Sequence, residues 1–156
     1  MFFERLLILL FKVFLYINYR KKYNLNPTFK FNGYLIRFNG EGEIIVGDGS
    51  YISFYSYINV LKGTMVRIGK DVSIGHNVKI YTSGIDTKEL ILNQKKKIIS
   101  GNVIIGNNVL IGANCFICPG VTIGHNVVVG ANSVVTVDII DNSVVVGSPA
   151  KVVKIY

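Results

Sequence analysis

The chain has 156 residues, half of them apolar, and a formal net charge of +8. This length fits one domain with a continuous core. A basic surface suits nucleic acid, anionic lipid, an acidic glycan or a phosphorylated cofactor, but no RNA- or DNA-binding motif is visible, so nucleic acid is not expected as a partner.

Residues 1–23 form an apolar segment that Lys12 interrupts and that ends in three basic residues, 20–22. The segment is too short and too interrupted for a comfortable membrane span, and no small-residue cleavage site follows it. An amphipathic helix over these residues has two interpretations. Residues 2–22 lie on the inner surface of the cytoplasmic membrane, or they pack on the domain that follows and cap its core.

Residues 24–43 are expected to connect this helix to a repeat that begins at residue 44. Aliphatic residues then recur at every sixth position, in two runs that are offset by an insertion near residues 62–66. The residues that open these units are Val46, Ile52, Ile58, Ile68, Ile74 and Ile80. An excursion over residues 83–102 then breaks the register.

The clearest run of sixes opens at Ile105, Ile111, Ile117, Ile123 and Val129. A period of six fits neither a helix nor a simple strand, and it is typical of a parallel β-helix that buries its core by stacking coils. The opening residue of each unit points inward, and a small residue four positions later fills the remaining core. The fourth position is Asn or Gly, which tolerate the positive φ of a corner. Three units make a coil of about 18 residues, which predicts an all-β solenoid of about four coils.

Cys115 and Cys118 form a C-x-x-C string. Such a string suggests a redox pair or half of a zinc site, but a structural zinc site needs four ligands and no second pair exists. Cys115 falls on the inward small position of its unit. We therefore interpret the pair as structural, with no metal expected.

The run from residue 104 to residue 154, IIGNNVLIGANCF through GSPAKVVK, resembles the C-terminal half of the hexapeptide-repeat acyltransferases. It is most similar to the sugar and polysaccharide O-acetyltransferases of the galactoside and maltose type. The resemblance covers residues 44–156, including a C-terminal tail over 144–156. It implies a left-handed coil, a homotrimer, and acetyl-CoA bound in the groove between neighbouring subunits.

Carried over by position, the resemblance implies five residues that contact acetyl-CoA. Ala113 and Ala131 would line the channel for the pantetheine arm. Thr136 would approach the pyrophosphate, and Lys151 and Lys154 would lie near the adenosine phosphate.

Two positions depart from the family. Val137 stands where the family commonly has a lysine, and Ile85 stands where the galactoside-type branch has its catalytic histidine. Transfer of an acetyl group to a hydroxyl needs a group that takes the proton, usually a histidine. His76 and Asp86 are the candidates for this base, and His125 is interpreted as structural. Alternatively, alignment of the substrates contributes most of the rate.

Three lysines, Lys95, Lys96 and Lys97, lie on the excursion. They either contact an acidic sugar, a sugar-lipid pyrophosphate or the CoA phosphate, or they form a solvated loop tip.

The expected function is that of an acetyl-CoA-dependent O-acetyltransferase. The expected acceptor is a glycan: a sugar hydroxyl of a surface polysaccharide or its lipid-linked precursor. The protein would be cytoplasmic or peripheral on the inner face of the membrane. The alternative is a non-catalytic trimeric scaffold or a membrane-associated binding protein, which the missing histidine at Ile85 supports. A γ-type carbonic anhydrase needs three histidine ligands for zinc, and the chain has only two histidines.

Overall fold

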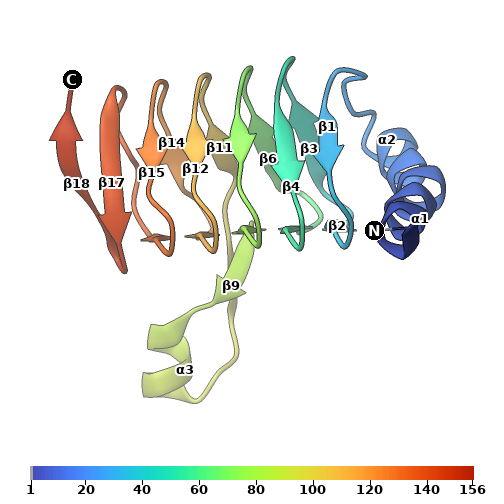
Figure 1. Cartoon of the computed structure of the whole chain (residues 1–156). Coiled ribbons are helices and arrows are strands. Elements are labelled where there is room, and N and C mark those ends of the chain that lie inside the picture. The colour runs from blue at the N-terminus through green and yellow to red at the C-terminus, as the bar shows by residue number, and fades with distance from the viewer. Residues whose placement is uncertain (1) are drawn as a thin grey trace.

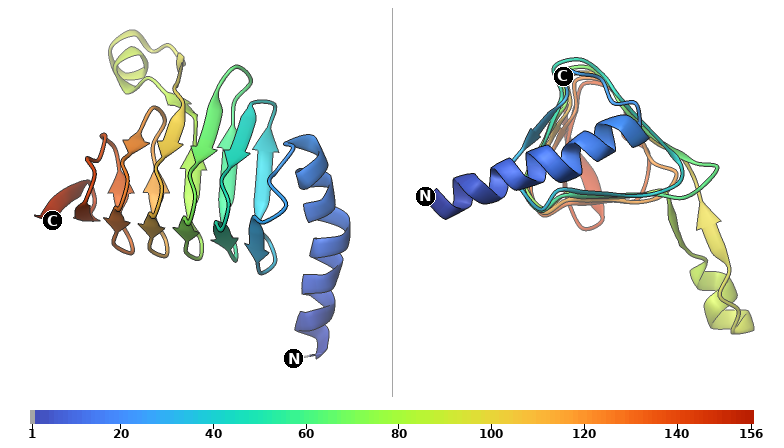
Figure 2. Two further views of the ribbon diagram at one scale, coloured as in Figure 1. Left: turned by 90° about the horizontal axis from the view of Figure 1, so that it is seen from above. Right: turned by 90° about the vertical axis from the view of Figure 1, so that its right-hand side faces the viewer.

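The protein is a three-sided solenoid with a helix across its N-terminal end and a hairpin that projects from one side (Figure 1). The computed structural model describes residues 2–156. Seen along the solenoid axis, the coils superpose into a triangular outline (Figure 2).

Each side of the triangle is a parallel sheet. Sheet A stacks β1 (Lys30–Asn32), β4 (Tyr51–Ser53), β7 (Ser73–Ile74), β12 (Leu110–Ile111), β15 (Val128–Val129) and β17 (Ser143–Gly147). Sheet B stacks β2 (Arg37–Gly40), β5 (Tyr57–Val60), β8 (Lys79–Tyr81), β13 (Phe116–Ile117) and β16 (Val134–Val135). Sheet C stacks β3 (Glu43–Val46), β6 (Met65–Ile68), β11 (Val103–Ile105) and β14 (Thr122–Ile123). We name the three edges after the sheets they join: AB, BC and CA.

The solenoid has about five coils, one more than the sequence repeat predicts. The extra coil comes from residues 24–43, which were expected to be a connector but contain β1 and β2 in register with the next coil. Its inward residues are Phe31 and Phe38, which pair with Ile52 and Ile58. Because these phenylalanines are seven residues apart, the period of six misses them.

The core is built as the repeat predicts. The residues that open the units are all buried, from Val46 to Val129, and in the clear run so are the small residues four positions later, from Val109 to Ser133. The fourth positions of the clear run all have positive φ, for example Asn114 at 60° and Gly120 at 83°. Coils stack so closely that a Cβ on Gly112 would lie 2.5 Å from the amide nitrogen of Ala131.

The N-terminal helix consists of α1 (Phe2–Leu10), a π-helical segment η1 (Phe11–Tyr16) and α2 (Ile17–Lys22). Its second half packs on the open end of the first coil. The ring of Tyr16 stacks on Phe31 with centroids 4.2 Å apart, and its hydroxyl donates to the carbonyl of Gly33 at 2.9 Å. This half therefore caps the core. Within residues 2–156, none of the helices has the length and apolar content needed to cross a bilayer.

The excursion is an ordered hairpin that leaves the solenoid at the BC edge (Figure 1). It consists of β9 (Ser83–Ile85), α3 (Thr87–Asn93) and β10 (Ile98–Ser100), with β9 and β10 antiparallel. The C-terminal tail forms β18 (Ala150–Ile155), which folds back antiparallel on β17 and covers the last coil.

Candidate active site

Three of the predicted site residues lie on the AB edge in successive coils. His76, Ala113 and Ala131 are the corner residues of the third, fourth and fifth coils. The N–H of Asn114 donates to the carbonyl of His76 at 2.9 Å, and the N–H of Asn132 donates to that of Ala113 at 2.8 Å. The structure thus brings one candidate base and the two predicted pantetheine contacts into one row.

The two histidines have different surroundings. His76 is exposed and meets the ring of Phe54 edge-on, with centroids 5.4 Å apart. His125 lies on the CA edge, where its Nδ1 accepts the N–H of Asn107 at 2.9 Å. Both side chains are exposed; that of His125 links two neighbouring coils, which agrees with its structural interpretation, and that of His76 packs against an aromatic ring.

A hollow of about 450 Å³ lies on the outer face of sheet B beside the AB edge. It is lined by Leu35, Arg37, Tyr55, Ser56, Tyr57, Asn77, Lys79 and Tyr81. A row of aromatic rings crosses this face: Tyr57 and Tyr81 have centroids 5.6 Å apart, and Tyr81 stacks on Phe116 at 5.2 Å. The hollow thus combines aromatic surface with two cationic side chains.

The ammonium group of Lys79 is held inside this hollow. Its Nζ donates to the carbonyl of Tyr55 at 3.0 Å and to Oδ1 of Asn77 at 2.6 Å. Burial lowers the pKa of Lys79 from its ordinary value, because desolvation disfavours the charged form. A negatively charged ligand in the hollow would offset that cost.

Two bulky residues of the hollow occupy left-handed corners. Leu35 has a φ of 57° and Tyr55 a φ of 63°, at positions where the later coils have asparagine. Such a backbone is unfavourable for large side chains and often marks a functional site. The repeat does not predict this hollow, although the outward aromatic residues beside the inward Ile58 and Ile80 are a signal of it in the sequence.

The remaining predicted residues lie elsewhere. Asp86 caps α3, since its Oδ1 accepts the N–H groups of Lys88 and Glu89 at 3.0 and 3.2 Å. Lys95, Lys96 and Lys97 follow α3 and are exposed. Thr136 is exposed at the BC edge of the fifth coil. The width of sheet B separates it from Ala131 within one subunit.

The two predicted phosphate lysines, Lys151 and Lys154, are exposed on β18 beyond the last coil. The ammonium of Lys154 lies 4.1 Å from the ring centroid of Tyr156. These lysines share the C-terminal end of the solenoid with Ala131 and Thr136.

The chain has clear relatives among proteins of known structure. A family model described as the hexapeptide repeat of succinyl-transferase matches residues 102–137 and 120–147. A maltose O-acetyltransferase from Clostridium difficile 630 is 32% identical, with a TM-score of 0.69, over 99% of this chain and 85% of that one. The chain belongs to the hexapeptide-repeat acetyltransferase family.

Two further structures of similar proteins contain coenzyme A or acetyl coenzyme A. A galactoside acetyltransferase in complex with coenzyme A is 30% identical, with a TM-score of 0.69, over 98% of this acetyltransferase and 78% of that chain. A hexapeptide-repeat acetyltransferase from Vibrio cholerae O1 biovar eltor, in complex with acetyl coenzyme A, is 28% identical, with a TM-score of 0.73, over 95% and 82%. The family fold is the left-handed parallel β-helix, which confirms the predicted fold class.

The cysteines of this acetyltransferase are both free. Cys115 points into the core, where its thiol lies 3.1 Å from the carbonyl oxygen of Gly130, and burial raises its pKa. Cys118 is half-buried, and burial raises its pKa as well. Across residues 2–156 the structure contains no cluster of three His, Cys, Asp or Glu side chains that could hold a metal ion.

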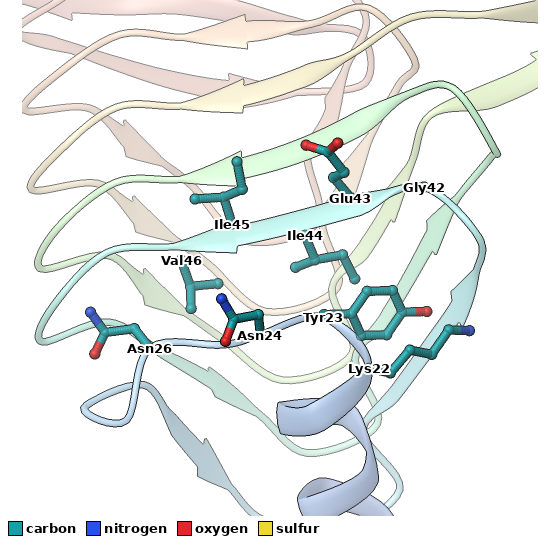
Figure 3. A pocket seen from close by; sticks show the side chains of 9 residues that line it. All are labelled: Lys22, Tyr23, Asn24, Asn26, Gly42, Glu43, Ile44, Ile45 and Val46. Carbon is teal, nitrogen blue, oxygen red and sulfur yellow. The ribbon is translucent and has the colours of Figure 1, made fainter.

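A second hollow of the acetyltransferase, about 540 Å³, lies away from the predicted site. It is formed where the chain leaves α2 and passes β3, and Figure 3 shows Lys22, Tyr23 and Glu43 around it. None of the predicted site residues lines this hollow. This hollow is therefore separate from the row of predicted residues on the AB edge.

Proposed function

We propose that this acetyltransferase moves the acetyl group of acetyl-CoA to a sugar hydroxyl of a surface polysaccharide or its lipid-linked precursor. The hollow on sheet B carries the proposal, because it pairs aromatic rings with Arg37 and Lys79 beside the AB edge. Apolar faces of sugar rings pack on aromatic rings, and these cations suit a carboxylate or phosphate on the glycan. The O-acetyltransferases of similar structure are named for maltose and galactoside.

The donor would lie along the AB edge. Ala113 and Ala131 present small side chains in successive coils, so an extended pantetheine arm meets little obstruction there. Lys151 and Lys154 lie farther along the solenoid, where they would attract the phosphates of CoA. The thioester would then point toward the third coil, which contains His76.

His76 is the proposed base. The acceptor oxygen attacks the thioester carbonyl as His76 takes the hydroxyl proton; the C–S bond then breaks, and the proton passes to the departing sulfur to release CoA as a thiol. Asp86 is the weaker candidate because its carboxylate already accepts two N–H groups at the start of α3. Its role is to cap the helix of the hairpin.

A homotrimer would complete the groove. Three aliphatic side chains on the outer face of the last coils are exposed in the single chain: Leu110, Val128 and Val146. Leu110 and Val128 pair across adjacent strands of sheet A, and Val146 lies on the next strand, so a neighbouring subunit would cover aliphatic surface on this sheet. The hairpin of that neighbour would then close the acceptor side of the groove, with Lys95, Lys96 and Lys97 facing the glycan.

Acetyl transfer can be measured as CoA release in the presence of acidic and neutral glycans, with CoA binding measured by calorimetry. We expect release that rises with a glycan acceptor, and the absence of CoA binding would overturn the proposal. His76→Ala should lower kcat by about 10²–10⁴-fold with CoA affinity unchanged. Asp86→Ala is the matched control. If neither variant loses activity, the assignment of the base is wrong even though the transferase function stands.

The acceptor hollow has its own test. Tyr57→Ala and Tyr81→Ala should raise the KM for the glycan and leave the affinity for CoA unchanged. Unchanged glycan KM in both variants would show that the acceptor binds elsewhere.

A further inference from the structure

The N-terminal helix has an apolar face that is turned away from the solenoid. Tyr16 is 2% exposed against the first coil, whereas Phe14 and Ile17 on the same stretch are 66% and 44% exposed. Taking about 100° per residue in the α-helical parts and about 80° in the π-helical segment, the exposed apolar side chains fall within one arc of about 150°. These residues are Phe3, Leu6, Leu9, Leu10, Phe14 and Ile17. We name this set the apolar stripe.

The positive charge of the protein is concentrated at the same end. Residues 1–40 contain seven lysines and arginines and a single acidic residue, Glu4, a net charge of +6 out of +8 for the whole chain. Arg5, Lys21 and Lys22 are exposed on the helix itself, and Lys30 is exposed on the first coil. An apolar stripe flanked by basic residues is the pattern of a helix that lies on an anionic membrane surface.

The orientation of the helix suits such a surface. The helix crosses the end of the solenoid, roughly perpendicular to its axis, and its first turns extend past the triangular outline (Figure 2). A flat surface that contacts the apolar stripe would meet only the N-terminal end. The AB edge and the hairpin at the BC edge lie on the sides of the solenoid and would remain accessible.

We propose that residues 2–22 dock the protein on an anionic lipid surface, with the helix parallel to the membrane plane and the solenoid axis along its normal. The apolar stripe enters the boundary between headgroups and acyl chains, and the basic residues are attracted by the negative lipids. Charge favours lipid over a second copy of the chain, because a second copy would bring another net charge of +6 to the contact. This interface is additional to the active site and does not depend on the identity of the acceptor.

The test is co-sedimentation of the full chain with vesicles of phosphatidylcholine, alone or mixed with phosphatidylglycerol. We expect binding to the mixed vesicles that weakens by about tenfold or more in high salt. Leu9→Glu with Phe14→Glu, at 56% and 66% exposure, should weaken binding to the mixed vesicles about tenfold or more. The matched control is Ile91→Glu with Leu92→Glu on α3, at 75% and 67% exposure, which should bind as the wild type does.

Light scattering without lipid distinguishes docking on lipid from contact between two copies of the chain. An unchanged oligomeric state in Leu9→Glu with Phe14→Glu, together with lost vesicle binding, supports the proposal. If the wild type does not bind the mixed vesicles, or if both double variants lose binding equally, the proposal is overturned. It is also overturned if the helix variant dissociates the oligomer, since the apolar stripe would then be covered by another subunit.

Discussion

Removal of one group, the hydroxyl of Tyr16, tests whether the N-terminal helix caps the core. This hydroxyl donates to the carbonyl of Gly33 at 2.9 Å and accepts the N–H of Ile36 at 3.4 Å. Tyr16→Phe keeps the ring on Phe31 but leaves a buried carbonyl and a buried amide without this partner. The expected loss is about 1–3 kcal/mol of unfolding free energy, or roughly 2–12 °C in Tm for a chain of this size.

The same substitution should also change how the free energy of unfolding depends on pH above about pH 10. Burial raises the pKa of Tyr16 to about 12, so the folded state favours the neutral phenol. Its stabilising contribution is complete below the unfolded pKa of about 10 and is lost as the pH rises toward 12. The difference between a pKa of about 10 and one of about 12 corresponds to roughly 3 kcal/mol. Tyr16→Phe has no phenol to ionise. The difference in unfolding free energy between the wild type and this variant should therefore shrink between pH 10 and pH 12.

Guanidinium unfolding followed by circular dichroism, at pH 8 and at steps between pH 10 and pH 12, measures both effects. Phe14→Ala is the matched control: its side chain is exposed two positions away, and we expect a change within about 0.5 kcal/mol. If Tyr16→Phe is no more destabilising than Phe14→Ala at pH 8, the second half of the helix does not cap the core as described.

Three further outcomes are expected. Leu110→Lys with Val128→Lys should dissociate the proposed trimer into monomers, as measured by light scattering. Trimers that persist would show that sheet A is not the subunit contact. Asp86→Ala should lower the amide-exchange protection of α3 by about 1 kcal/mol while the coils keep theirs, and uniform loss would contradict a purely local cap. Cys118 should react with a thiol reagent faster than the buried Cys115, which the order of modification by mass spectrometry checks.

The period of six was sufficient to predict the solenoid, because each inward Ile or Val can be recognised from its spacing in the sequence without knowing which residues pack against it. It was not sufficient for the first coil, where Phe31 and Phe38 take the inward positions at a different spacing. Those rings fill the end of the core together with tyrosines from the helix, and such packing between distant segments leaves no local period. The predicted coil number was therefore one too few.

The candidate site was predicted only in part for a related reason. The row of His76, Ala113 and Ala131 follows directly from the repeat, since residues one coil apart occupy the same edge. The hollow on sheet B depends instead on outward residues of different coils, such as Arg37 and Tyr81, whose proximity appears only once the coils are stacked. The role of Asp86 depends on the hairpin forming a helix that the broken register did not indicate.

The excursion begins and ends at almost the same point of the BC edge. Thr82 and Gly101 flank it, and the N–H of Gly101 donates to the carbonyl of Thr82 at 3.0 Å. Coil stacking on either side, with Ile80 paired to Ile117 and Ile105 paired to Ile68, continues as though the hairpin were absent. The length and sequence of the hairpin can thus change without altering the stacking of the coils on either side. If the hairpin contacts the acceptor as proposed, replacing it would change acceptor preference and leave the stacked core intact.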